Sequence, residues 1–285
     1  SNLKTINICY VETSTSTAYP WDIIFLLYLK FKKIKISIYI RDAYPLFKEF
    51  WGGLKFYQYP LYLGWYISKT VYHLLADITY YPTKSLQKLF NPKNGKLLPP
   101  AANCIVNKFS SVSNKLLYAG NLNERYGLPL MQKVIGKVRQ RIPALEWHVI
   151  SNSISEDADL GDGITILNKS FADLSDSNFE YFAAIIPLRT TKYNHLALPV
   201  KLFDYLSWGL PIIASNCLEQ SSFILDNEFG EVFPDTAEEL SRGIVDIYFD
   251  KAQLEYYNKQ ILNNVRTSHY WIHRAEKIIR DLNYL

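Results

Sequence analysis

The chain has 285 residues, of which 48% are hydrophobic and 20% are charged, and its formal net charge is +4. This length allows two domains with cores of their own, and the composition excludes an intrinsically disordered chain. Because the excess of positive charge is small, we expect no nucleic acid among the partners.

The cysteines and the absence of targeting patterns indicate where the protein works. Its three cysteines, Cys9, Cys104 and Cys217, are scattered without metal-ligand spacing, as is usual in a reducing compartment. No apolar run reaches the length of a membrane-spanning helix, and the N-terminus lacks a signal-peptide pattern. We therefore expect a cytoplasmic protein.

The N-terminal elements alternate between strand and helix. Apolar patterning predicts a strand at 7–11, a helix at 21–31 and a second strand at 36–40, which together make a βαβ unit. The second strand ends in Arg41 and Asp42. These two residues either face a ligand beyond the end of the strand or only fix the loop that follows it.

The stretch 51–66 is rich in aromatic residues and poor in charge. Such a stretch either packs in a core or lies at a membrane interface, where Trp and Tyr are well placed. Four lysines lie a little earlier in the chain: Lys30, Lys32, Lys33 and Lys35. They form either a solvated helix end or a site of attraction to anionic lipid.

A polar, serine-containing segment at 101–114 predicts the linker between two domains. The second domain then begins with a strand at 115–119, and a turn bounded by Gly120 and Gly127 leads into a helix. A glycine-bounded turn between strand and helix suits a diphosphate, because backbone N–H groups converge there. Taken alone, the two glycines are a weak signal.

Further strands are predicted at 147–150, 164–167 and 183–188, the last as an apolar run typical of a strand buried on both faces. Between the first two, the acidic segment 156–163 lacks the spacing of a calcium-binding loop and reads as a solvated connector. Asn168 follows the second of these strands.

A short helix follows, with Pro199 expected at its first position, and Gly209 and Pro211 end it before a strand at 211–215. Lys201 lies in the first helical turn, where the helix dipole disfavours a cation and a bound anion would offset that cost. Asp204 lies one turn further on. The pair either belongs to a ligand site or forms an ordinary surface ion pair.

Residues 199–215, with the pattern P-x-K-L-F-D-Y-L-x-x-G-L-P-I-I-A-S, resemble the nucleotide-sugar site of retaining glycosyltransferases of family 4. The similarity extends through 116–215 and more weakly back to about residue 36. It implies an α/β protein of the GT-B fold, in which two Rossmann-like domains with parallel sheets face a central cleft. The N-terminal domain looks truncated relative to the family. The resemblance implies domains at 1–108 and 109–268, and a C-terminal helix at 269–285 that returns to the first domain.

The resemblance also implies roles for residues. Asp204 matches the second acid of the family's motif, which holds the ribose of the donor, whereas Leu196 stands where the first acid is expected. Asn121 and Tyr126 replace the usual phosphate-binding Arg and Lys, so we expect Arg125 and Lys201 to substitute for them. The donor-binding residues predicted in this way are Gly120, Asn121, Arg125, Asn168, Pro199, Lys201, Leu202 and Asp204. The predicted catalytic set is Arg41, Asp42, His195 and Lys201, although His195 also reads as a plain loop histidine.

The implied activity is transfer of a sugar, with retention, from a nucleotide-diphosphate sugar to a glycan or lipid-linked acceptor in polysaccharide or cell-envelope glycan synthesis. We expect no metal and no cofactor besides the donor substrate. Residues 51–66 are the candidate for peripheral contact with the inner face of the membrane. The alternative is a catalytically degenerate homologue that binds a nucleotide or a partner protein, which the missing Arg, Lys and first acid favour.

Overall fold

The computed structural model describes residues 6–13, 17–47, 50, 56–121, 128–151, 160–168, 170–171, 173–174 and 177–284, without the side chain of Tyr57. The chain divides into two compact units. Unit 1 comprises Ser1–Pro99 and Ile272–Leu285, and unit 2 comprises Pro100–Trp271.

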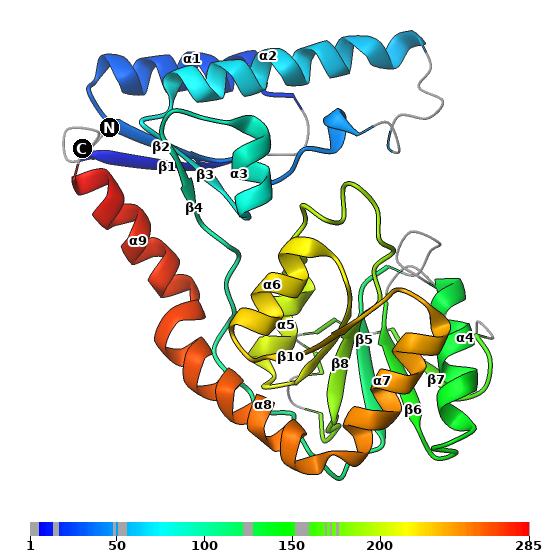
Figure 1. The fold of residues 1–285 in the computed structure, drawn as a ribbon. Helices are drawn as coiled ribbons and strands as arrows, with labels where there is room; N and C mark the ends of the chain where they lie inside the picture. The colour runs from blue at the N-terminus through cyan, green and yellow to red at the C-terminus, as the bar shows by residue number, and fades with distance from the viewer. Residues whose placement is uncertain are drawn as a thin grey trace. The chain divides into compact units, whose positions relative to one another are not determined.

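Unit 1 is built on a four-stranded parallel sheet in the order β1-β2-β3-β4, so sequential strands are neighbours (Figure 1). Its regular elements, in chain order, are β1 (Ile8–Glu12), α1 (Pro20–Phe31), β2 (Lys35–Tyr39), α2 (Tyr59–Leu75), β3 (Ile78–Tyr81), α3 (Lys84–Phe90), β4 (Gly95–Leu97) and α9 (Trp271–Asn283), with short 3₁₀ turns at Tyr44–Leu46 and Phe56–Gln58.

Because all three crossovers proceed in one direction and crossovers are right-handed, α1, α2 and α3 lie on one face of this sheet. The C-terminal helix α9 covers the other face, where its Ile278 and Leu282 pack against Tyr39 and Tyr80. Its Asp281 accepts a hydrogen bond of 2.9 Å from the Tyr80 hydroxyl. The last helix therefore completes the core of the first unit.

The crossover face of the same sheet is sealed by a few large side chains. Ile36 and Ile38 of β2 are completely buried, and Leu26 and Leu29 of α1 are 2% exposed. The start of α1 is tied to α2 by a hydrogen bond from the Ala18 amide to the Ser68 hydroxyl. Most of the remaining residues of α1 are exposed.

Unit 2 contains a six-stranded parallel sheet in the order β10-β9-β8-β5-β6-β7 (Figure 1). Its elements, in chain order, are β5 (Lys115–Ala119), α4 (Leu128–Arg139), β6 (Glu146–Ile150), β7 (Ile164–Leu167), β8 (Ala183–Ile186), α5 (Val200–Ser207), β9 (Ile212–Ser215), α6 (Leu218–Asp226), β10 (Gly230–Phe233), α7 (Ala237–Phe249), α8 (Lys251–Asn264) and a π-helical turn at Val265–His269.

The strand order of unit 2 reverses between β5 and β8, which makes this the topological switch point of a Rossmann-like sheet. The central strands β8 and β9 are completely buried, as their continuous apolar sequences predict. Helices cover both faces, and each face carries its own apolar cluster. Such sheets bind ligands beyond the carboxyl ends of the strands at the switch point.

Most predicted elements are present with shifts of one or two residues, and two details differ from the sequence analysis. Pro199 is the N-cap of α5 rather than its first helical residue, because its ψ of 133° is extended. The aromatic stretch 51–66 contains both a buried and an exposed aromatic side chain. Trp65 is 7% exposed and belongs to the core, whereas Phe56 is 91% exposed. Residues 51–55 lie outside the described part of the chain.

Candidate functional site

The candidate site lies at the switch point of unit 2, where the loops after β5 and β8 meet the start of α5. Gly120 follows β5 directly with a φ of +130°, a conformation that favours glycine. A Cβ atom at this position would lie 2.7 Å from the Nζ atom of Lys201. The glycine therefore makes room for the ammonium group, and the two residues meet although they are 81 positions apart in the chain.

The ammonium group of Lys201 is enclosed by protein. Its Nζ atom is inaccessible to solvent and lies 4.2 Å from the centre of the Tyr118 ring. Burial lowers the pKa of Lys201 to about 7, while the nearby Asp204 carboxylate opposes this shift. A desolvated cation gains stability from a bound anion, so the enclosed ammonium favours a ligand site for Lys201 and Asp204 over an exposed surface pair.

Asp204 is half-buried on the next turn of α5. Burial raises the pKa of its carboxyl group, and the Lys201 ammonium acts in the opposite direction. Lys201 and Asp204 thus provide a donor and an acceptor on one short helical face at the end of β5. This combination suits a ligand that carries both anionic oxygens and hydroxyl groups.

Two tyrosines fix the end of β5, one to α5 and one to the loop that follows the strand. The amide of Ala119 donates a 2.7 Å hydrogen bond to the hydroxyl of Tyr205, which is completely buried. The hydroxyl of Tyr118 donates to the carbonyl of Asn121 at 2.8 Å. The sequence analysis gave these tyrosines no role, although Tyr205 lies four residues after Lys201 and therefore on the same side of the helix.

The loop between β8 and α5 is fixed by its own polar contacts. The side-chain amide of Asn194 donates to the Arg189 carbonyl at 2.7 Å, and the Thr190 amide donates to Asp235 at 2.8 Å. The Arg189 guanidinium lies 3.6 Å from Asp235 and its side chain is 60% exposed. Arg189 is thus an exposed cation at the carboxyl end of β8 that the sequence analysis did not select.

His195 has a structural role in this loop. Its Nδ1 accepts a 3.1 Å hydrogen bond from the Leu218 amide at the start of α6, and its carbonyl accepts one from the Glu219 amide. These contacts satisfy N–H groups that a helix start leaves unpaired. The loop-histidine interpretation therefore accounts for what is seen, while a catalytic role for His195 remains a prediction.

The other predicted donor-binding residues are distributed unevenly. Leu202 is completely buried among apolar side chains of unit 2, so its side chain packs in the core, and a donor contact by this residue remains a prediction. Asn168 follows β7, which lies two strands from β5 and thus about 10 Å away. Arg125 lies outside the described residues.

Arg41 and Asp42 follow β2 in unit 1. Arg41 is exposed, whereas Asp42 is 7% exposed and accepts a hydrogen bond from the backbone of Tyr44. Burial raises the pKa of Asp42 to about 6. A buried carboxyl at a strand end, titrating near neutrality, is typical of a functional residue, although a structural role gives the same shift.

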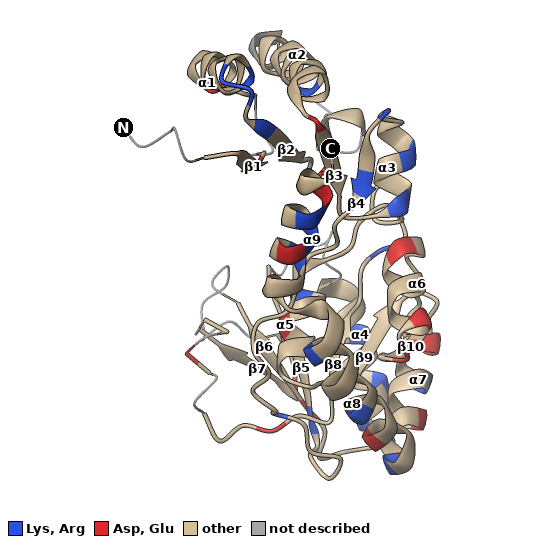
Figure 2. Cartoon of the chain, turned by 90° about the vertical axis from the view of Figure 1, so that its left-hand side faces the viewer, with Lys and Arg blue, Asp and Glu red and all other residues tan. Residues whose placement is uncertain are grey.

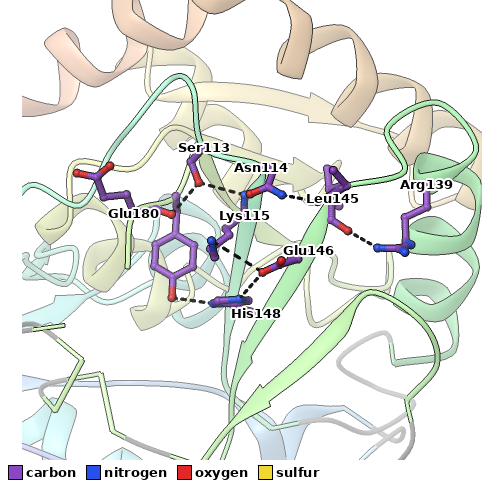
Figure 3. Close-up of polar contacts among 10 residues, drawn as sticks. Ser113, Asn114, Lys115, Arg139, Leu145, Glu146, His148 and Glu180 are labelled. Atoms are coloured by element: carbon purple, nitrogen blue, oxygen red, sulfur yellow. Dashed lines mark hydrogen bonds and ion pairs between the residues drawn. The ribbon is translucent and has the colours of Figure 1, made fainter. Parts of the chain in front are cut away.

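A second polar cluster lies at the amino ends of β5 and β6 (Figure 3). His148 contacts Glu146 at 3.2 Å and the hydroxyl of Tyr181 at 3.3 Å, and Lys115 lies 3.9 Å from Glu146. Burial lowers the pKa of His148. Because ligands of parallel sheets bind at the opposite edge, we assign this cluster to the stability of the sheet.

We also considered a groove on the surface of unit 2 and the possibility of a metal site. A groove of ≈ 650 Å³ between α4 and α7 contains Lys133, Lys137 and Arg189, but Asp235 and Glu238 lie beside these cations and reduce its charge. Among the described residues, no group of three or more His, Cys, Asp or Glu side chains is arranged to hold a metal ion.

Comparison with protein families gives a match over residues 113–250 to the family described as "Glycosyl transferases group 1". Residues 113–250 thus resemble a group 1 glycosyltransferase domain. This span contains the switch point, Lys201 and Asp204. Comparison of the sequence with curated proteins gives no match.

Solved structures of similar fold support this domain and extend the similarity to both units. Sucrose-phosphate synthase from Thermosynechococcus elongatus has a TM-score of 0.67 at 14% identity, over 96% of this chain and 72% of that one. WaaG, a glycosyltransferase involved in lipopolysaccharide biosynthesis, has a TM-score of 0.55 at 9% identity, over 95% and 98% of the two chains. The pneumococcal O-GlcNAc transferase GtfA, in complex with UDP and GlcNAc, has a TM-score of 0.58 at 13% identity.

This chain covers 54% of the length of the O-GlcNAc transferase and 90% of its own. At such identities the likeness concerns the fold alone. The predicted GT-B fold, with two Rossmann-like units, is confirmed. Family and fold together support glycosyl transfer as the general activity.

Proposed function

We propose that the protein transfers a sugar from a nucleotide-diphosphate sugar to a glycan or lipid-linked acceptor with retention of configuration, without a metal ion, in polysaccharide or cell-envelope glycan synthesis. The observation that carries the proposal is the position of the Lys201 ammonium against Gly120 at the switch point, with Asp204 on the next turn of the same helix. The UDP seen with the O-GlcNAc transferase is a donor nucleotide of the kind proposed.

In the proposed mechanism, each part of the donor has a counterpart in unit 2. The Asp204 carboxylate accepts hydrogen bonds from the ribose hydroxyls. The Lys201 ammonium and the start of α5 stabilise the diphosphate, and the charge that develops on it as the sugar leaves. Arg125, Asn121 and Asn168 remain predictions as further donor contacts.

Retaining transfer of this kind needs no protein nucleophile. The leaving diphosphate accepts the proton of the acceptor hydroxyl on the same face of the sugar, and the protein positions the reactants. Arg41 and Asp42 remain predictions as catalytic residues. The proposed location is the cytoplasmic side of the membrane, with peripheral contact through 51–66 where the acceptor is lipid-linked.

Donor hydrolysis across a panel of nucleotide sugars tests the proposal. We expect one donor to be hydrolysed by the parent protein, at an unchanged rate in the presence of a chelator, and more slowly by Asp204→Ala. The anomeric configuration of the released sugar, measured by NMR, reports whether retention holds. Binding of nucleotide diphosphate without any hydrolysis or transfer would support the degenerate homologue instead, which the leucine at position 196 favours.

A further inference from the structure

Helix α1 exposes apolar side chains along one whole face. Those at 21, 24, 25, 28 and 31 follow the i, i+3, i+4 spacing of a single helical stripe. Trp21 is 77% exposed and Phe31 80% exposed, and Ile24 and Phe25 are both more than half exposed. The opposite side of α1, with Leu26 and Leu29, faces the sheet. No described part of unit 1 covers the outer stripe.

Helix α2 carries a matching stripe beside it. Tyr59, Leu63, Ile67 and Leu74 recur at helical spacing and are each more than half exposed. The buried Trp65 and Tyr72 lie on the other side of this helix, toward the sheet. Because α1 and α2 lie on the same face of the sheet, both stripes point away from it. Together these two stripes form what we call the outer apolar face.

The charges around the outer apolar face are almost all positive. Residues 20–35 contain four lysines and one acidic residue, and residues 59–75 contain one lysine and no acidic residue. In Figure 2 the Lys and Arg positions of these elements are blue and the Asp and Glu positions red. Lys30 pairs with Asp77, but Lys32 and Lys33 are exposed, and Lys32 lies 5.6 Å from the Tyr28 ring centre and 5.8 Å from that of Phe31.

We infer that the outer apolar face of α1 and α2 docks on a bilayer surface that contains anionic lipid. Trp21 and the tyrosines at its rim combine an apolar ring with a polar group, which suits the boundary between headgroups and acyl chains. Lys32 and Lys33 stand beside the stripe, where they can contact lipid phosphates while the apolar residues enter the boundary region. The lysines beside the stripe favour an anionic lipid surface as the occupant over a second copy, which would bring the same net positive charge.

The contact is interfacial rather than spanning. The 12 residues of α1 correspond to a length of about 18 Å, short of the ~30 Å hydrocarbon layer. None of the helices in the described ranges meets the length and hydropathy needed to cross a bilayer. The helices would therefore lie in the plane of the membrane surface.

This inference rests on the membrane contact contained in the proposed function and extends it from 51–66, which contributes Tyr59 and Leu63, to α1 and the rest of α2. It does not depend on sugar transfer, because vesicle binding and nucleotide binding are measured separately. A chain that binds vesicles but no nucleotide would contradict only the proposed function. A chain that binds nucleotide but no vesicles would contradict only this inference.

The test is co-sedimentation of the full chain with vesicles of phosphatidylcholine alone and with vesicles containing phosphatidylglycerol. The parent should bind the anionic vesicles. Exchange of Trp21 and Phe31 for Ser should weaken that binding at least ~10-fold, because the two exposed rings no longer enter the interface. The thermal melting temperature should change little, since neither side chain belongs to the core.

Two sets of variants sharpen the result. Val112→Ser and Phe249→Ser, which remove side chains of unit 2 that are 84% and 64% exposed, should leave vesicle binding unchanged. Lys32→Gln and Lys33→Gln should each weaken binding to anionic vesicles by about fivefold and leave neutral vesicles unaffected.

Three outcomes would overturn the inference. One is the absence of binding at any anionic lipid content. Another is equal binding by the parent and by the Trp21 and Phe31 variant. The third is a dimer seen by analytical ultracentrifugation without lipid that the same variant dissociates, which would identify a second copy as the occupant.

Discussion

Both units are built on a parallel sheet with helical crossovers, but the exposed apolar side chains are distributed differently on their surfaces. In unit 2 the large exposed apolar side chains are scattered, as at Val112 and Phe249, and the unusual chemistry is enclosed at the end of β5. In unit 1 the apolar side chains of α1 and α2 form continuous exposed stripes. Scattered apolar residues need no explanation, whereas a continuous patch marks a surface that something covers.

The two units also differ in the helices that complete their cores. Unit 2 closes with helices of its own, whereas unit 1 depends on α9 from the far end of the chain. One face of unit 1 is therefore sealed only when residues 272–285 are in place.

Truncation of a buried side chain of α9 should destabilise unit 1. Leu282 is completely buried, so Leu282→Ala should lower the free energy of unfolding by about 2–5 kcal/mol through lost burial and the cavity that remains. Urea unfolding measures the change. Ile279→Ala, on the same helix but 47% exposed, is the matched control and should cost less than about 0.5 kcal/mol. Equal effects of the two variants would show that α9 does not seal this face.

Loss of the Asp204 carboxylate should weaken nucleotide binding by unit 2 more than it lowers the stability of that unit. Asp204→Ala should weaken binding of a nucleotide diphosphate by about 1.5–3 kcal/mol, because hydrogen bonds to a charged acceptor are lost. Titration calorimetry measures the affinity. Asp226→Ala, an exposed carboxylate on α6, is the control and should bind like the parent. Equal affinity of Asp204→Ala and the parent would place the nucleotide elsewhere.

The enclosed lysine should couple stability to pH. The pKa of Lys201 is about 7 in the folded protein and 10.5 as its ordinary value, so the unfolded chain binds more protons between these pH values. Stability of the parent should therefore rise with pH across this window, by at most about 1.4 kcal/mol per pH unit, and level off below pH 7, where Lys201 is protonated in both states. Urea unfolding at pH 7 to 9 should show this slope in the parent and not in Lys201→Met.

The same substitution separates stability from binding. Near pH 7, Lys201→Met should be at least as stable as the parent, because no ammonium group has to be desolvated, yet it should bind diphosphate more weakly. In the parent, the preference for nucleoside diphosphate over nucleoside should decrease above pH 7 as Lys201 loses its proton, and also with added salt. A preference that is independent of pH would exclude Lys201 as the phosphate cation.

The smallest effect is expected at the amino edge of the unit 2 sheet. Burial lowers the pKa of His148, so the unfolded chain takes up a proton first as the pH falls below the ordinary value of 6.5, and the folded form loses stability. His148→Gln should reduce the loss of unfolding free energy between pH 7 and pH 5. Nucleotide affinity should not change, because this cluster lies at the opposite edge from the site. A changed affinity would contradict the assignment of the cluster to stability.

Much of the fold was predictable because its signals are local. Continuous apolar runs predicted the buried strands, and proline and glycine predicted the limits of the helix that carries Lys201. The helix α8 was missed, since its 14 residues carry many polar side chains and only Leu254, Tyr257, Asn258 and Ile261 are buried. A stripe this narrow gives little periodic signal in the sequence.

Local patterns predicted the buried strands and the helix that carries Lys201, and they drew attention to Lys201 and Asp204, since all of these depend on neighbours within a few residues. Only the tertiary structure decided that the Lys201 ammonium is enclosed against Gly120 and Tyr118, and that Leu202 belongs to the core. It also decided that α1, a helix apolar on nearly every side, keeps one face uncovered. Burial is set by contacts between segments far apart in the chain, and no local pattern of residues specifies which of two apolar faces another element will cover.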